Sequence, residues 1–350
     1  MARIKGRVTI VLIILMTVIF IGGCQSQDVV KGAGEGWEVV APIGKHVYGM
    51  TTAVLDGKVH LLGGVHGGDW TDPIDFHQVY DPTTDSWSML AAIPDPRGGI
   101  GWGMSAIYDG KIYLFGGGSG PDLEGSKRVW VYDPAIDEWS QLSDMPVERI
   151  NGSAVTADDF IYIFGGHRLH VPPADELIST YRYDPLTDSY ERMANMPERG
   201  SFITRAYYNG NIYAITGVEQ EWLGGDEFFY IYGQGVLKYD VAANRWTKLD
   251  VPRIRQRTYT LTQLSTDVTD GSRLFVLGGK PPESSRTNLA AYFDMETEKF
   301  GQIGALPKGR CCGSAAVIDG KIYVAGGFWE RIEDVYNCEE TWSYNLSEEK

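Results

Sequence analysis

The sequence predicts an all-β fold built from repeated four-stranded units, and two observations support this prediction. An apolar segment ending in two glycines recurs about every fifty residues, and such a period indicates one supersecondary unit per repeat. The chain also contains 43 Gly, 20 Tyr and 10 Trp in 350 residues, a mixture typical of tight turns between aromatic strands. We therefore expect one repeated fold rather than several unrelated domains.

The composition excludes some classes of protein. Charged residues make up 22% and hydrophobic residues 43% of the chain, which is ordinary for a packed globular protein and too apolar for a disordered one. The formal net charge is −15, from 31 Lys and Arg against 46 Asp and Glu. Nucleic-acid binding is not expected, because an acidic chain has no attraction for the phosphate backbone.

Residues 1–23 predict an export signal. Basic residues precede the apolar run Val8–Ile21, which is shorter than the roughly 20 residues of a membrane-spanning helix. Small residues then lead to a cysteine in Ile21-Gly22-Gly23-Cys24. This segment resembles the lipobox of bacterial lipoproteins, which implies cleavage before Cys24 and a lipid on its sulfur. The alternative is an uncleaved membrane anchor with a chance cysteine.

Residues 24–36 are expected to be a flexible tether, because they are polar and rich in glycine. The folded unit is expected over residues 37–350. The lipobox resemblance implies export and lipid anchoring to the bacterial cell envelope. It further implies the outer membrane if the host has one, since Gln25 rather than Asp follows the cysteine.

Each repeat shows the same four strands in order. The first strand runs into a two-residue turn of the Asp-Gly or Asn-Gly type, which predicts a hairpin with the second strand. The second strand ends at the two glycines. The third carries a Tyr-Asp or Phe-Asp pair, and an aromatic residue six positions after this Asp begins the fourth. The first glycine of each pair, or the residue that replaces it, is Gly63, Gly116, Gly165, Thr216, Gly278 or Gly326.

This pattern of diglycine, Tyr-Asp and spaced aromatic residue resembles the Kelch repeat. The resemblance implies that each unit is one blade of a six-bladed β-propeller. The last repeat has its third strand at Trp342–Asn345, and the chain ends before a fourth strand is expected. The segment Trp37–Pro42 matches a fourth strand that lacks a third strand before it. We therefore expect the N-terminal strand to complete the sixth blade and close the ring.

Strand direction predicts which loops lie together. Two kinds of loop are expected on one face of the propeller: those that join a fourth strand to the first strand of the next blade, and those that join second to third strands. We call this face the loop face. The long loops all fall there, where function usually lies. Their aromatic side chains offer stacking surfaces for a glycan or anchors for a protein partner, although they could instead cap the blade cores. The tryptophan candidates are Trp70, Trp222 and Trp329.

A basic residue recurs nine or ten positions after each fourth-strand aromatic residue. These six residues predict a ring around the mouth of the central channel, which would attract an anionic ligand in an otherwise acidic protein. The alternative is that the arginine belongs to the repeat and pairs with blade carboxylates or loop carbonyls. The six residues are His46, Arg97, Arg149, Arg199, Arg255 and Arg310.

The cysteines and histidines give weaker indications. Cys311, Cys312 and Cys338 all fall in the last repeat, and an exported protein could form a disulfide between Cys338 and either of the other two. His167 and His170 lie in one loop, but two loop histidines are weak evidence for a metal. We expect no metal, no cofactor and a monomer.

The absence of an identifiable catalytic motif favours a non-catalytic module that binds a glycan or a protein, with an anionic ligand as one possibility. The alternative is an enzyme. The segment Gly279–Thr287 resembles, at a Lys-Pro and an Arg-Thr, the periplasmic Kelch N-acetylneuraminate epimerases. That resemblance implies a role for Arg286, and Glu283 is the candidate acid or base because the family's glutamate position falls on Gly279.

Overall fold

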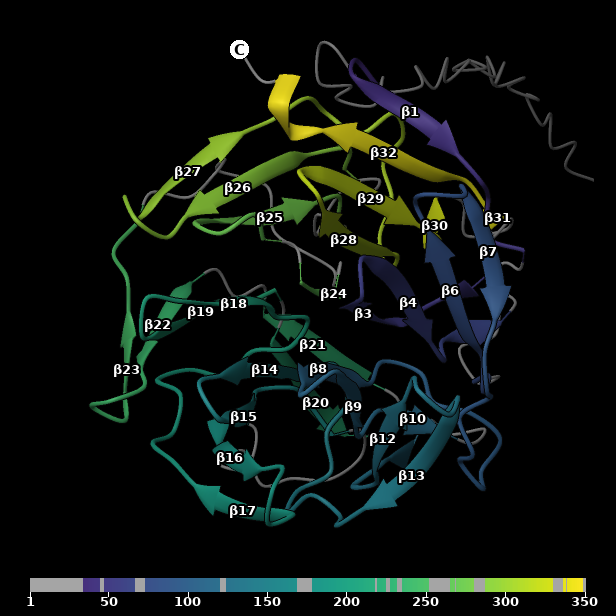
Figure 1. Ribbon diagram of the computed structural model, residues 1–350. Helices are drawn as coiled ribbons and strands as arrows, with labels where there is room; N and C mark the ends of the chain where they lie inside the picture. The colour runs from purple at the N-terminus through teal and green to yellow at the C-terminus, as the bar shows by residue number, and fades with distance from the viewer. Residues whose placement is uncertain are drawn as a thin grey trace, which may run out of the picture.

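The computed structural model describes residues 34–44, 47–66, 73–119, 124–168, 178–217, 219–224, 227–231, 235–251, 265–267, 269–279, 287–329, 336–337 and 339–348. Antiparallel sheets are arranged around a central axis (Figure 1). The predicted six-bladed β-propeller is confirmed. No helix in the described part of the chain is long and apolar enough to cross a membrane.

Blades 1 to 4 are regular four-stranded sheets in chain order. Blade 1 consists of β3 (Thr51–Leu55), β4 (Lys58–Leu62), β6 (His77–Asp81) and β7 (Ser86–Met89), and blade 2 of β8 (Met104–Tyr108), β9 (Lys111–Phe115), β12 (Val129–Asp133) and β13 (Glu138–Leu142). Blade 3 consists of β14 (Ser153–Ala157), β15 (Phe160–Phe164), β16 (Thr180–Asp184) and β17 (Ser189–Arg192), and blade 4 of β18 (Thr204–Tyr208), β19 (Asn211–Ile215), β22 (Val236–Asp240) and β23 (Arg245–Lys248).

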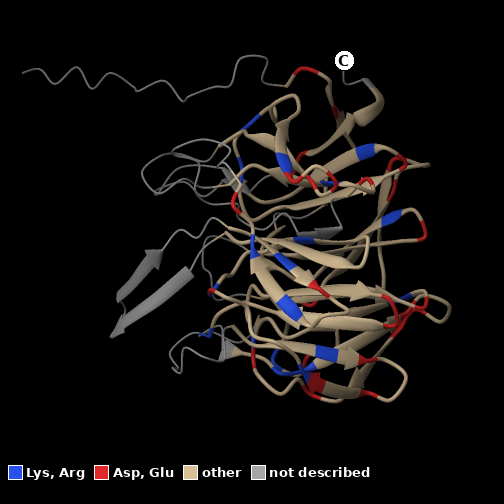
Figure 2. Ribbon diagram, turned by 90° about the vertical axis from the view of Figure 1, so that its left-hand side faces the viewer, with Lys and Arg blue, Asp and Glu red and all other residues tan. Residues whose placement is uncertain are grey.

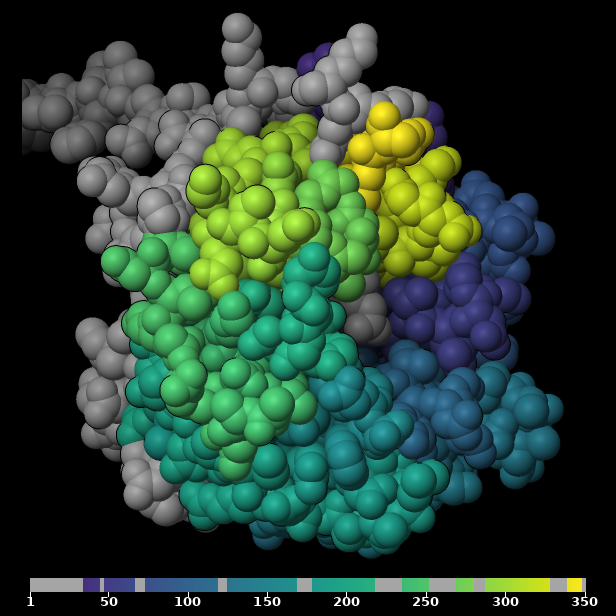
Figure 3. All heavy atoms as spheres, turned by 60° about the vertical axis from the view of Figure 1, so that its left-hand side comes forward, coloured from purple at the N-terminus to yellow at the C-terminus, as the bar shows by residue number. Residues whose placement is uncertain are grey.

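Blade 6 joins the two ends of the chain, as predicted. Its strands are β28 (Ser314–Ile318), β29 (Lys321–Ala325), β32 (Thr341–Asn345) and the N-terminal β1 (Trp37–Val40). Trp37 pairs with Tyr344 across the β1–β32 ladder, and their ring centroids lie 5.0 Å apart. N-terminal segments in purple lie against C-terminal segments in yellow in Figure 3. The N-terminal strand thus supplies the aromatic residue that the last repeat lacks.

Blade 5 departs from the predicted pattern. Its sheet contains β25 (Arg273–Leu277), β26 (Ala290–Asp294) and β27 (Lys299–Gln302), whereas β24 (Ser265–Asp267) pairs in parallel with β28 of blade 6. Within the described residues of this blade, the expected first hairpin is represented by one bridge between Thr269 and Leu274. The sequence of β24 is Ser-Thr-Asp, so it lacks the buried alanine or valine that the first strands of the other blades carry as their third residue.

Short two-stranded ribbons lie on the loop face. Three of them lie in connections between second and third strands, and a fourth joins β2 (Val47–Tyr48) to β5 (Val65–His66). The three are β10 (Gly118–Ser119) with β11 (Glu124–Gly125), β20 (Glu219–Gly224) with β21 (Glu227–Ile231), and β30 (Phe328–Trp329) with β31 (Tyr336–Asn337). The long loops of blades 2, 4 and 6 therefore contain extended backbone.

The Tyr and Trp of the repeat are structural residues. In blade 2, Tyr132 and Trp139 pair across strands with ring centroids 5.1 Å apart. The Tyr132 hydroxyl donates to Asp137 at 2.7 Å, and this carboxylate also accepts the N–H of Ala91 from blade 1 at 2.9 Å. These two hydrogen bonds lower the pKa of Asp137. The Trp139 indole donates to the carbonyl of Ala91 at 2.9 Å. One aromatic pair therefore connects blade 2 to blade 1.

The close approach of the neighbouring blade requires two glycines at the end of the second strand. In blade 1 the N–H of Gly64 donates to the carbonyl of Ile100, in the loop before blade 2, at 2.8 Å. Gly63 has a φ of +60°, and a Cβ there would lie 2.0 Å from the same carbonyl oxygen. Equivalent hydrogen bonds join Gly117 to Arg149, Gly166 to Gly200, Gly279 to Arg310 and Gly327 to Val47. Glycine is therefore needed because the next blade comes too close for any side chain.

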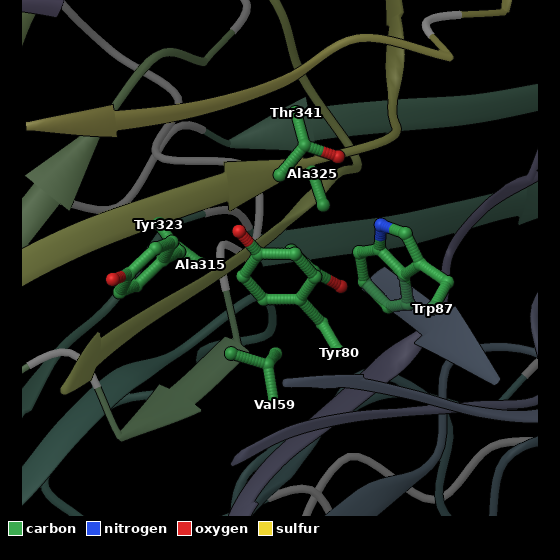
Figure 4. A pocket seen from close by; sticks show the side chains of 8 residues that line it. Val59, Tyr80, Trp87, Ala315, Tyr323, Ala325 and Thr341 are labelled. Atoms are coloured by element: carbon green, nitrogen blue, oxygen red, sulfur yellow. The ribbon is translucent and has the colours of Figure 1, made fainter. Parts of the chain in front are cut away.

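The interface that closes the ring contains a small cavity, which Figure 4 shows between side chains of blades 1 and 6. Tyr80 and Trp87 of blade 1 lie on one side, and Tyr323 and Ala325 of blade 6 on the other. The residue that ends the second strand is larger in the other blades: Leu62, Phe115, Phe164, Ile215 and Leu277. Alanine at this position leaves space that a leucine or phenylalanine fills elsewhere.

The diglycine contact predicts a large loss of stability for Gly63→Ala. The new methyl group cannot coexist with the Ile100 carbonyl, so we expect the free energy of unfolding to fall by about 3 kcal/mol or more. Gly110→Ala is the matched control, because Gly110 also has a positive φ of 67° but its Cβ would meet nothing within 4 Å. Its cost should be about 1 kcal/mol. Equal losses in urea unfolding would contradict the steric explanation.

Candidate functional site

The loops that precede the first strands form the centre of the loop face. Hydrogen bonds from backbone N–H groups to backbone carbonyls, 2.8–3.0 Å long, link these loops in series. The N–H of Phe202 donates to the carbonyl of Asn151, and the N–H of Asn151 donates to the carbonyl of Trp102. The N–H of Trp102 donates in turn to Gly49, and that of Gly49 to Cys312. All five residues have a positive φ between 53° and 65°. Four of them are not glycine, and such backbone conformations persist only where the surroundings impose them. This series could not be predicted from the sequence, because no single residue type marks the position.

Apolar side chains pack beneath this backbone series. Tyr48, Val65, Trp102, Ile150, Cys311 and Cys312 form one buried cluster. The Tyr48 and Trp102 rings lie 6.0 Å apart in an edge-on arrangement, which is favourable for aromatic pairs. The centre of the loop face is therefore a rigid, packed platform that positions the surrounding loops.

Arg149 and Arg310 are structural, which corrects the prediction that they line a channel mouth. Arg149 is 1% exposed, and it donates to the carbonyls of Gly165 at 2.6 Å and Ser179 at 2.9 Å. Arg310 is 0% exposed, donates to the carbonyl of Gly326 at 3.1 Å, and stacks on the Trp342 ring at 3.6 Å. Each arginine thus ties its loop to the diglycine of its own blade.

The predicted arginine ring also mixes different blade positions. The residue whose carbonyl accepts the diglycine N–H defines equivalent positions, and these are Val47, Ile100, Arg149, Gly200 and Arg310. Arg97 lies three residues before its equivalent position, and Arg199 lies one residue before its own. His46 and Arg255 lie outside the described residues. The described arginines therefore do not form one ring.

Arg97 has a different environment from Arg149 and Arg310. Its Nε lies 3.6 Å from Oδ1 of the buried Asp95, whose Oδ2 lies 3.5 Å from Nη1 of Arg128. The side chains of Arg97 and Arg128 are 25% and 30% exposed. Two partly accessible cations therefore lie beside one buried carboxylate on the loop face of blade 2.

The other predicted site residues are only partly placed. Trp222 lies in β20 and Trp329 in β30, both in loop-face ribbons. The Sγ atoms of Cys311 and Cys312 lie 3.7 Å apart in the buried cluster, and a disulfide to Cys338 stays a prediction. The remaining candidates lie outside the described residues: Trp70, Cys24, Cys338, Glu283, Arg286 and His170.

Three histidines are buried and neutral at neutral pH. Burial lowers the pKa of His167 to about 4. His60 and His77 form a pair between their strands, with Nδ1 and Nε2 2.9 Å apart. Burial lowers the pKa of His60 to about 4 and that of His77 to about 3, the latter helped by the neighbouring imidazole. Among the described residues, no group of three or more His, Cys, Asp or Glu is placed to hold a metal ion.

Acidic residues gather at the turns of the opposite face, toward the right of Figure 2. Many of these turn residues have a positive φ, which Asp and Asn tolerate better than most residues. Asp residues with this conformation are Asp56, Asp85, Asp109, Asp137, Asp158, Asp188 and Asp319. Part of the net negative charge therefore follows from turn geometry and lies away from the loop face.

The fold and the blade contacts define the class of protein: a β-propeller whose repeated residues hold the ring together. Residues 105–146, 148–197 and 309–350, which cover blades 2, 3 and 6, match the family described as Kelch motif. The chain is a Kelch-repeat protein.

The chain is similar to several Kelch-like proteins. It is 30% identical over 247 residues to Kelch-like protein 25 of Xenopus tropicalis, covering 68% of this chain and 38% of that protein. It is 25% identical over 292 residues to Kelch-like protein 23 of Homo sapiens, covering 83% and 47%. It is 34% identical over 149 residues to Kelch-like protein terF of Aspergillus terreus, covering 41% and 32%. The chain spans less than half the length of these relatives.

The histidine pair predicts that stability falls in mild acid. Its pKa values are lower in the folded protein than the usual value of 6.5, so the unfolded chain binds more protons below that pH. We expect the free energy of unfolding to decrease from pH 6.5 to about 4, by up to about 1.4 kcal/mol per pH unit for each histidine.

Urea unfolding at several pH values would measure this effect. His77→Phe removes one titrating group and should reduce the slope between pH 6.5 and 4, whatever its effect on stability at pH 7. Ile136→Ala, at a position that is 63% exposed, should leave the slope unchanged. A parent protein whose stability does not vary over this range would disprove the assignment.

The contacts of Arg149 predict that it contributes to stability rather than binding. Arg149→Leu leaves the carbonyls of Gly165 and Ser179 without their donor, so we expect a loss of about 2–4 kcal/mol. Lys308→Gln removes an ion pair with Glu340 whose side chains are 45% and 43% exposed, and it should cost less than about 1 kcal/mol. Thermal unfolding compares the two variants, and a small effect for Arg149→Leu would argue against the structural role.

Proposed function

We propose that this Kelch-repeat propeller is a non-catalytic module that binds a protein partner on its loop face. The observation that carries the proposal is that the repeated residues are used in contacts that hold the blades together. The aromatic pairs, diglycines, Arg149 and Arg310 are all engaged in contacts within and between blades. The side chains left for a partner are those of the connecting loops, and Kelch propellers are typical protein-binding modules.

The loop face suits a partner better than the opposite face. The opposite face consists of short turns, whose Asp and Asn side chains accept hydrogen bonds from the preceding blade. The loop face carries the three ribbons β10–β11, β20–β21 and β30–β31 on a packed centre. Extended ribbons with aromatic residues supply the large anchors that dominate binding energy in protein interfaces.

The proposal also places the propeller at the cell envelope. The support is the lipobox-like segment that ends at Cys24, followed by a polar tether of residues 25–36. A lipid on Cys24 would hold the propeller close to the membrane while the tether lets the loop face reach a partner. A single acyl chain binds membranes only weakly, so a diacyl anchor fits stable attachment.

The binding proposal predicts that loop-face tryptophans are needed for partner capture. Replacing Trp70, Trp222 or Trp329 by Ala should weaken capture about tenfold or more, because aromatic anchors contribute disproportionately to interfaces. The matched controls are Ile136→Ala and Leu186→Ala. These residues are 63% and 80% exposed on turns of the opposite face, so binding should not change. Quantitative affinity capture from extracts of the host measures the difference.

The outcomes separate the alternatives. Selective loss in the tryptophan variants supports the loop face as the binding surface. Loss in the Ile136 or Leu186 variants would move the site to the opposite face. Saturable, tryptophan-dependent binding on a glycan array, without capture of a protein, would replace the protein partner with a glycan.

A further inference from the structure

Two hydroxyl-bearing residues line the cavity in the interface that closes the ring. Ser314 begins β28, Ala325 ends β29 and Thr341 begins β32. The two ladders pair Ala325 with both of the others, so the three residues form one row across blade 6. All three line the cavity together with Trp87 of blade 1, and Figure 4 shows Thr341, Ala325 and Trp87 around the same space.

The two hydroxyl groups need a partner that the described residues do not provide. Ser314 is 0% exposed and Thr341 is 1% exposed. Neither Ser314 Oγ nor Thr341 Oγ1 has a hydrogen-bond partner in the described part of the chain. A buried hydroxyl without a partner is costly. Two of them beside one cavity therefore indicate a bound molecule that can form hydrogen bonds.

The size of the cavity selects the molecule. The cavity offers about 10 Å³ to the centre of a water-sized sphere, which is close to the space that one water molecule requires. Larger molecules with hydroxyl groups do not fit. Water also has the required chemistry, because one molecule can donate to one hydroxyl oxygen and accept a hydrogen bond from another. Ala325 lies between the two hydroxyl-bearing residues in the row, and its methyl group leaves room for the water.

The equivalent row of blade 3 shows how another interface provides a partner for its threonine. This row consists of Ser153, Phe164 and Thr180. The indole of Trp246 in blade 4 donates to Thr180 Oγ1 at 3.0 Å, and the centroid of its ring lies 5.1 Å from that of Phe164. Ser153 Oγ has no partner among the described residues either. The two interfaces therefore differ at the threonine.

Trp87 does not provide this hydrogen bond at the ring-closing interface. Trp87 is the residue of blade 1 that is equivalent to Trp246, but its indole donates to the carbonyl of Ala41 at 2.9 Å. Its N–H is already used, so Thr341 requires a different donor. The diglycine contact across this interface is also longer. Its N to O distance is 3.2 Å at Gly327 and 2.8–2.9 Å in the other four contacts.

We propose that one water molecule is bound in this cavity, with hydrogen bonds to the hydroxyl groups of Ser314 and Thr341. The water donates to Thr341 in place of the indole that donates to Thr180 between blades 3 and 4. It is part of the ring closure, because it fills the space between the last blade and the first. Buried water that bridges polar groups is costly to remove, so this molecule contributes to the stability of the closed ring.

A double-mutant cycle measured by urea unfolding tests this inference. The variants are Ser314→Ala, Thr341→Val and the two combined, which remove the hydroxyl groups with little change of shape. Each single variant should lower the folding equilibrium constant about fivefold, the usual effect of losing one hydrogen bond. The combined variant should lose little more than either single variant, because a water that has lost one of its two partners contributes little through the other.

The equivalent row of blade 3 provides the matched control. Ser153→Ala and Thr180→Val are the same two substitutions, but Phe164 lies between these positions in the row. Its ring leaves no room for a water that both hydroxyl groups share. The effects of the two substitutions on the folding equilibrium constant should therefore multiply to within about twofold.

A crystal structure of the parent protein tests the site directly and does not depend on the variants. It should show density for one water about 2.8 Å from both hydroxyl oxygens, and a structure of Thr341→Val should lose this density. An empty cavity in the parent protein would overturn the inference. A gain of stability in the single variants would also overturn it, because their hydroxyl groups would then have had no partner. Independent losses from Ser314→Ala and Thr341→Val would exclude a shared water.

Discussion

Five of the six blades are held to the next by a close backbone contact that glycine permits. The second glycine donates its N–H to a carbonyl in the following loop, while the first leaves no side chain in the way. This contact fixes where each loop crosses from one blade to the next. The series of positive-φ residues at the centre of the loop face follows from it, because these residues come two positions after the accepting carbonyls.

The same constraint divides the arginines into two kinds. An arginine whose own carbonyl accepts the diglycine N–H, such as Arg149 or Arg310, has its side chain beside the next diglycine and donates to it. An arginine displaced from this position, such as Arg97, remains on the loop face beside Asp95. A three-residue difference in loop length therefore decides whether a repeated arginine is buried beside a diglycine or lies partly exposed on the loop face.

Most of the fold could be predicted from the sequence because its determinants are local. The Asp-Gly turns, the diglycines and the aromatic pairs each depend on a few neighbouring residues, and the register of Tyr344 with Trp37 followed from the repeat. The structural positions of the arginines could not be predicted in this way. They were located by their distance in sequence from an aromatic residue, and the loop between the two differs in length from blade to blade. The parallel pairing of β24 with β28 also escaped prediction, since it joins segments of two different blades.

The candidate site was predicted only as a face of the molecule. The loops that carry it were recognised from their length, but the shared carboxylate of Asp95 required the three-dimensional contact between two connections that are distant in sequence. Amide hydrogen exchange would test the account most directly. Because the N–H groups of Gly64, Gly117, Gly166 and Gly279 donate to carbonyls of the following loops, we expect these amides to exchange about a hundredfold or more slowly than amides of exposed turns. Exchange as fast as that of exposed turns would contradict the account.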